Sequence, residues 1–116
     1  MRHIRAGLLR EPVFLGRPQV AQDAAGAPAV TWQELKTFAA IEPVTGREFL
    51  GAGLLKDAVD VKITVRISLG WEPDARWRVR DAVSGRIYNI VSALLMPKEK
   101  AAECLARSAS GNSDGR

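Results

Sequence analysis

The sequence predicts a mainly β protein: a small antiparallel β-barrel of five to six strands, with little helix and a long loop between the second and third strands. Three observations support this fold class. Apolar residues recur at every second position from Val61 to Leu69, which is the period of a half-buried strand. Other short apolar runs are separated by turn signals rich in glycine and proline. The 116 residues leave room for one hydrophobic core and no second one.

The first strand is expected in the segment Arg10 to Pro18. Its apolar residues, Val13 to Leu15, stand between two prolines, and proline is tolerated best on an edge strand. The pattern therefore predicts a short strand at an edge. The next segment, Gln19 to Ala29, contains mostly small residues with one glycine and one proline, and is interpreted as a flexible connection.

The segment Thr31 to Pro43 is ambiguous between helix and strand. Trp32, Leu35 and Ala39 stand at helical spacing, and its leucine, glutamate, lysine and alanine residues favour a helix. The alternation from Leu35 to Ile41 favours a strand instead. The residues themselves leave both readings open.

A long apolar and basic segment follows, from Val44 to Ala58. Three glycines within eight residues argue against a helix throughout, although one turn of helix is compatible with Arg47 to Leu50. Loops of this length in compact domains are uncommon and are usually functional or disordered.

Strand signals continue after Val61 to Leu69. Gly70 to Asp74 is a turn, and in the run from Arg76 to Arg80 two apolar residues, Trp77 and Val79, alternate with three arginines. We expect the tryptophan and the valine to face the core. Val83 to Gly85 is a hairpin turn signal.

The run Arg86 to Met96 is apolar on both faces, which predicts a strand covered by the core on one side and by something else on the other. Pro97 to Lys100 turns the chain. Ala101 to Arg107 fits a short helix by propensity or a closing strand by context, and Ser108 to Arg116 is a polar tail that we expect to be disordered.

Composition excludes several function classes. The single cysteine, Cys104, and the single histidine, His3, allow no intramolecular disulfide, no zinc site of the usual cysteine type and no well-placed catalytic pair. We therefore expect a non-enzymatic protein with no cofactor and no metal. There is no apolar run long enough to cross a bilayer and no signal-peptide pattern, so we expect a protein made in a reducing cytoplasm without membrane contact.

The net charge of +4 and the isoelectric point near 9.7 permit contact with nucleic acid but do not require it. Two readings of the arginine stripe stay open: the solvent face of an edge strand, or a basic ridge that faces DNA or an acidic partner. The three tryptophans are more often core and turn packing than platforms for stacked bases.

Five short motifs occur in a familiar order and spacing. They are Ala6–Leu9 (AGLL), Thr31–Trp32, Ala39–Glu48 (AAIEPVTGRE), Ile63–Ile67 (ITVRI) and Gly85–Ile90 (GRIYNI). In these residues the chain resembles the head-tail joining family of tailed bacteriophages and phage-like particles, whose members are also described as head-tail adaptors, connectors or head-closure proteins. The resemblance extends from about Ala6 to Arg107.

The resemblance implies a barrel domain over residues 1–107, with a tail at 108–116, and favours the strand reading of the ambiguous segment. It implies a virion structural protein in the neck of a phage or gene transfer particle, assembled in the bacterial cytoplasm. The implied partners are further copies in a ring, dodecameric as in the family, a portal or upper adaptor protein, a tail-side neck or tail terminator protein, and double-stranded DNA in the channel.

Two sets of candidate site residues follow. The long loop would pack on a neighbouring subunit or line the channel, which makes the subunit-interface candidates Arg47, Glu48, Phe49, Leu50, Leu54 and Leu55. The candidates for contact with DNA in the channel are Arg47, Lys56, Arg76, Arg78 and Arg80. The alternative function is a monomeric barrel that binds single-stranded nucleic acid through the arginine stripe and stacking tryptophans.

Overall fold

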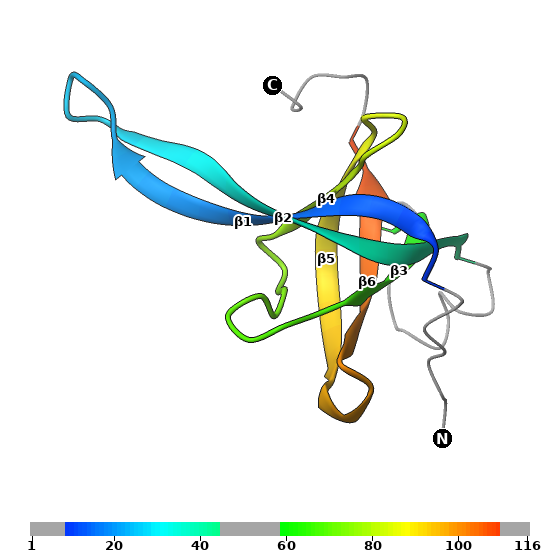
Figure 1. The fold of residues 1–116 in the computed structure, drawn as a ribbon. Coiled ribbons are helices and arrows are strands. Elements are labelled where there is room, and N and C mark those ends of the chain that lie inside the picture. Colours follow the sequence, from blue (N-terminus) through cyan, green and yellow to red (C-terminus); the bar gives the residue numbers. More distant parts are fainter. Residues whose placement is uncertain (1–8, 45–58, 110–116) are drawn as a thin grey trace.

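Six antiparallel strands close into a barrel with the order β1-β2-β3-β6-β5-β4 (Figure 1). The structure, a computed structural model, describes residues 9–44 and 59–109. The strands are β1 (Glu11–Gln22), β2 (Pro28–Pro43), β3 (Val61–Arg66), β4 (Arg78–Asp81), β5 (Ile87–Met96) and β6 (Ala101–Ser108). One short 3-10 turn, η3 (Pro97–Glu99), joins β5 to β6. The predicted fold class, a mainly β antiparallel barrel with little helix, is confirmed.

The core is built from the alternating positions that the sequence indicates. Ile63 and Val65 on β3 and Val79 on β4 are fully buried, and Trp77 is only 8% exposed, as predicted. Leu69 was expected to share the inward face of β3, but it lies beyond the end of the strand and is 95% exposed. The alternation therefore describes the strand correctly and overestimates its length.

Both ambiguous segments are strands. β2 pairs with β1 from Pro28 to Ala39 and with β3 from Ala39 to Pro43, and this tertiary pairing overrides the helical propensity of its residues. β6 lies between β3 and β5, and every second residue from Ala102 to Ala106 is fully buried. These buried residues are small, so β6 fits into the barrel wall where larger residues face it from β3.

Two predictions about the N-terminal part were wrong. β1 is a strand of 12 residues and lies inside the sheet, because it pairs with β2 on one side and with β4, from Val13 to Gly16, on the other. The segment Gln19 to Ala29 is not a flexible connection, because it forms the ends of two paired strands and the turn between them. The turn is stabilised by hydrogen bonds between its own residues: the Asp23 carboxylate accepts hydrogen bonds from the backbone N–H groups of Ala25 and Ala27.

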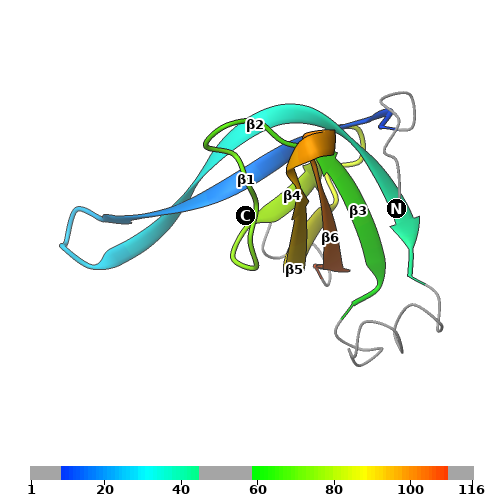
Figure 2. The ribbon, with the colours of Figure 1, turned by 90° about the horizontal axis from the view of Figure 1, so that it is seen from below.

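The paired ends of β1 and β2 project from the barrel as a hairpin arm, which we define as Pro18 to Trp32 (Figures 1 and 2). The pairing of β1 with β4 stops at Gly16, and the pairing of β2 with β3 begins at Ala39. Within the described part of the chain, the arm is thus a two-stranded ribbon with both edges open. The two prolines of the arm, Pro18 at its base and Pro28 beside its turn, are compatible with open edges, because proline has no backbone N–H to donate to a neighbouring strand.

β5 is covered only along its first half by the described residues. Ile87, Tyr88 and Ile90 are buried, and the register then shifts between Ile90 and Ser92, which marks a bulge. Beyond the bulge, Leu94 and Leu95 are 60% and 41% exposed. The sequence predicts that both faces of this strand are covered. Beyond the bulge, the described residues do not supply the second covering layer.

The long predicted loop connects β2 to β3. Its ends are close, since the backbone N–H of Val44 donates to the carbonyl oxygen of Asp60 at 3.2 Å. Residues 45–58 lie outside the described residues, as do residues 1–8 and 110–116. Among the residues that the structure describes, no helix is long and apolar enough to span a membrane.

Candidate assembly interface

The arm carries almost no charge. Of its 15 residues only Asp23 is charged, whereas 26% of the whole chain is Asp, Glu, Lys or Arg. The Asp23 carboxylate is engaged in the turn, where its Oδ1 accepts two backbone hydrogen bonds of 2.9 Å. The surface that the arm presents to solvent is therefore made of alanine, valine, proline and amide groups.

The apolar side chains of the arm gather on one face of the ribbon. Val20 is the cross-strand partner of Val30, and Pro18 is the partner of Trp32, so alternation places all four on the same face. Val20 and Val30 are 71% and 57% exposed. This face borders an open groove of about 640 Å³, whose other side is formed by Asp74, Arg76 and Trp77 of the β3–β4 connection.

Two cation–π contacts anchor the base of the arm. The Arg78 guanidinium from β4 lies 4.2 Å from the centre of the Trp32 ring. Gly16 lies beside both, and an added Cβ there would be 3.1 Å from Arg78 Cγ and 3.4 Å from Trp32 Cε3. The absence of a side chain at Gly16 therefore lets the arginine reach across β1 to the tryptophan.

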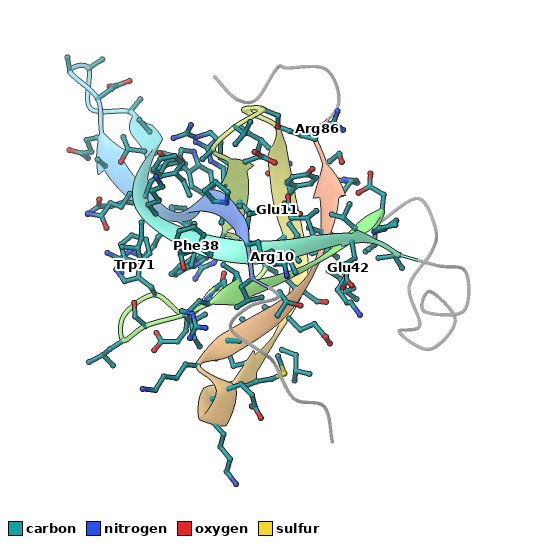
Figure 3. The ribbon with its side chains drawn as sticks, turned by 45° about the vertical axis from the view of Figure 1, so that its right-hand side comes forward. Arg10, Glu11, Phe38, Glu42, Trp71 and Arg86 are labelled. Carbon is teal, nitrogen blue, oxygen red and sulfur yellow. The ribbon has the colours of Figure 1, made fainter. Side chains whose placement is uncertain are left out.

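On the other face of the ribbon, the Arg17 guanidinium lies 4.2 Å from the centre of the Trp71 ring. Arg17 also donates hydrogen bonds to the carbonyl oxygen of Gly70 at 2.6 Å and to Gln33 Oε1 at 2.6 and 3.1 Å. Trp71 in turn meets Trp77 edge to face, at 5.9 Å between ring centres (Figure 3 shows Trp71 near the start of the arm). The direction of the arm is thus set by contacts on both of its faces.

The arginine stripe is organised around one carboxylate. Glu34 accepts two hydrogen bonds from Arg80, at 3.0 and 2.6 Å, and Arg78 Nη2 is 4.0 Å from the same group. The hydrogen bond with Arg80 lowers the pKa of Glu34 below its ordinary value and raises the pKa of Arg80. Arg80 also lies 4.4 Å from the centre of the Phe14 ring.

The three arginines therefore do not form one uniform basic ridge. Arg76 lies apart from the pair on β4: its side chain is 80% exposed and meets Asp74 at 3.3 Å. The edge-strand reading of the stripe is wrong, because β4 pairs with β1 and with β5. A role of Arg76, Arg78 and Arg80 in contact with DNA stays a prediction.

A second exposed apolar set lies at the β5–β6 end, which we define as Leu69 together with Leu94 to Lys100. Leu69, Leu94 and Leu95 are 95%, 60% and 41% exposed. An open groove of about 400 Å³ at this end is lined partly by Leu69, Pro97 and Lys100. The turn itself carries two lysines and one glutamate, a net positive charge.

Residues 9–44 and 59–109 hold no group of three or more His, Cys, Asp or Glu side chains placed to bind a metal ion. Burial raises the pKa of the Cys104 thiol to about 12, so this side chain is neutral and shielded in the barrel.

Sequence reasoning missed the arm and the β5–β6 end. The signals were present: the arm is a 15-residue stretch with one charge, and Leu94 and Leu95 follow each other in a strand that is apolar on both faces. The six predicted loop residues Arg47, Glu48, Phe49, Leu50, Leu54 and Leu55, and also Lys56, lie outside the described residues.

One family model and two solved structures relate this chain to known proteins. The family model described as phage head completion protein matches residues 4–108. Protein SF1141 from Shigella flexneri 2a, solved in solution, has the same fold with a TM-score of 0.70 and 22% sequence identity, and the match covers 92% of this chain and 98% of that one. A chain in the virion of a native gene transfer agent particle matches with a TM-score of 0.54 and 20% identity, over 89% of this chain and 97% of that one. None of the curated proteins matches the sequence.

Proposed function

Because the chain belongs to the phage head completion protein family, we propose that it is a head-tail connector subunit that forms a ring below the portal. The ring would extend or close the DNA channel and provide the surface to which the tail attaches. The family itself establishes the coarser statement, that this is a structural protein of the head-tail region of a phage or phage-like particle. We infer that it acts through its surfaces, without catalysis and without a cofactor.

The observation that carries the ring proposal is the exposure of large apolar side chains at two separate places on the subunit. Val20 and Val30 lie on the arm, and Leu69, Leu94 and Leu95 lie at the β5–β6 end. Extended apolar exposure in a small domain indicates contact with a partner. A head-to-tail contact requires two different surfaces on each subunit. Such contacts form a closed ring when the rotations that relate each subunit to the next add up to a full turn.

The β2–β3 connection supplies the second part of the proposal. Arg47, Glu48, Phe49, Leu50, Leu54 and Leu55 would contact the neighbouring subunit or line the channel. Arg47 and Lys56 would face DNA, and in the described part of the chain the exposed Arg76 is a better candidate than Arg78 or Arg80, which share Glu34. A channel must let DNA slide, so these contacts would be to phosphates, without base readout.

The alternative function, a monomer that stacks single-stranded nucleic acid on its tryptophans, gains no support from the geometry. Arg78 covers one face of the Trp32 ring and Arg17 covers one face of the Trp71 ring, while Trp77 is buried. A stacking platform needs an accessible ring face.

The test uses purified protein and DNA-filled heads that carry a portal but no tail. Mass photometry and electron microscopy should find a ring of this protein on the portal vertex, twelve copies as in the family, with other virion structural proteins binding after it. A protein that stays monomeric at all concentrations, leaves the heads unoccupied and binds single-stranded oligonucleotides would refute the connector function and support the alternative.

A further inference from the structure

We propose that the arm of each subunit packs on the β5–β6 end of the next copy in the ring. In this contact the face that carries Val20 and Val30 covers the exposed leucines Leu94, Leu95 and Leu69. The inference rests on the proposed ring and assigns the surfaces that build it.

The arm is suited to docking because it is apolar and already ordered. Its valine pair is largely exposed, and its base is fixed by the Arg78–Trp32 contact on one face and the Arg17–Trp71 contact on the other. An element that is ordered before binding loses less conformational entropy when it binds. The arm therefore presents a preformed surface at a fixed angle to the barrel.

The charges favour another copy of this chain as the partner. The single charge of the arm is the negative Asp23 at its tip, and the turn at the β5–β6 end carries Lys98 and Lys100 beside one glutamate. DNA is a poor partner for the arm, because the arm offers no positive charge to a phosphate. The leucines at the β5–β6 end match the valines in apolar character, and the positive charges of Lys98 and Lys100 are opposite to the negative charge of Asp23.

The arm and the β5–β6 end also project in different directions from the barrel, as two views at right angles show (Figures 1 and 2). One subunit can therefore give its arm to one neighbour and receive an arm from the other. This is the geometry of a head-to-tail contact that repeats around an axis.

Disulfide cross-linking tests the contact. The double variant Ala24→Cys/Lys98→Cys places one thiol at the tip of the arm and one on the turn of the β5–β6 end, both at exposed positions. The native Cys104 is buried and its pKa is raised to about 12, so its thiol should not take part in the cross-linking. In assembled rings, mild oxidation should give a ladder of covalent species that extends well beyond the dimer.

The matched control is Ala24→Cys/Val83→Cys, because Val83 is an exposed residue on the β4–β5 turn, away from the β5–β6 end. This pair should give no ladder. A ladder from the control pair, no ladder from the first pair, or products that stop at the dimer would overturn the proposed contact.

Point variants give a second readout. Val20→Asp should fold normally, since the side chain is exposed, and should need roughly tenfold more protein for half-maximal ring assembly. Leu94→Asp should have the same effect, whereas Val83→Asp should assemble as the parent protein does. The thermal unfolding midpoint of each variant shows whether the fold is retained.

The outcomes separate this inference from the function on which it rests. If the parent protein forms no ring on portal-bearing heads, the connector function fails and the contact fails with it. If rings form but Val20→Asp and Leu94→Asp assemble unchanged, the contact alone is wrong. If both variants form rings and then lose only portal or tail binding, another virion protein occupies the arm and the inference is refuted.

Discussion

Removal of the Glu34 carboxylate should destabilise the barrel by a measurable amount. Arg80 donates two hydrogen bonds to this group, at 3.0 and 2.6 Å, and Arg78 lies 4.0 Å away. A hydrogen bond to a charged group contributes about 1.5–3 kcal/mol, and an exposed ion pair about 0.2–1 kcal/mol. The Glu34 side chain is 24% exposed and that of Arg80 is 33% exposed. We therefore expect Glu34→Ala to lower the free energy of unfolding by about 1–2 kcal/mol, between these limits.

Urea unfolding of Glu34→Ala, Arg80→Met and the double variant measures the coupling between the two residues. The coupling energy should be about 1 kcal/mol. Glu34→Gln is the matched control for shape: its amide oxygen accepts one hydrogen bond, so about half of the loss is expected. A coupling energy below about 0.3 kcal/mol, which is the usual error of additivity, would show that the pair contributes nothing and that the reasoning fails.

The same carboxylate makes stability depend on pH in a defined direction. Its pKa is lowered in the folded protein, mainly by the hydrogen bond from Arg80, while the unfolded chain keeps an ordinary value of about 4.3. The contribution of Glu34 is therefore present above about pH 4.3 and is lost as the pH falls through the lower folded pKa. The difference in stability between the parent and Glu34→Gln should shrink below about pH 4.

Three further predictions concern the base of the arm, the interface and the channel. Gly16→Ala should lower the free energy of unfolding by about 0.5–1.5 kcal/mol, because the new methyl group displaces Arg78 from Trp32; an unchanged or higher urea midpoint would contradict this. Phe49→Ala should leave the monomer folded and weaken ring assembly by about 2–4 kcal/mol, as truncation of an interface anchor does; a monomer that unfolds would place this residue in the core. Lys56→Glu should let DNA leak from filled particles of normal composition, with Lys36→Glu at an exposed position of β2 as the control, and unchanged DNA retention would remove Lys56 from the channel.

The regular part of the barrel could be predicted because strand periodicity is a local signal. The alternation around Ile63 and Val65 places the core, and the β4–β5 hairpin follows from a turn in which Gly85 has a φ of +80° and the Asp81 carboxylate accepts N–H groups of the turn. The order of the short motifs gave the family, which the match over residues 4–108 confirms.

The rest depends on register between distant strands, which no local pattern contains. Gly16 is paired with Glu34 on one side and with Arg78 on the other, and only this alignment shows that Glu34 meets the arginines of β4 and that Arg78 reaches Trp32. The arm was misread for a related reason. Small residues with glycine and proline suggest a flexible connection, but the cross-strand pairing of Val20 with Val30 gives the segment order that composition does not.

Because the arm is a two-stranded ribbon, its length can change only in steps. Each residue added to a strand advances the tip by about 3.4 Å and turns every later side chain to the opposite face. A pair of residues inserted in each strand would carry the tip outward by about 7 Å and keep Val20 and its partner Val30 on their face, whereas a single residue in each strand would reverse that face. In related chains, the arm should therefore differ in length by even numbers of residues in each strand.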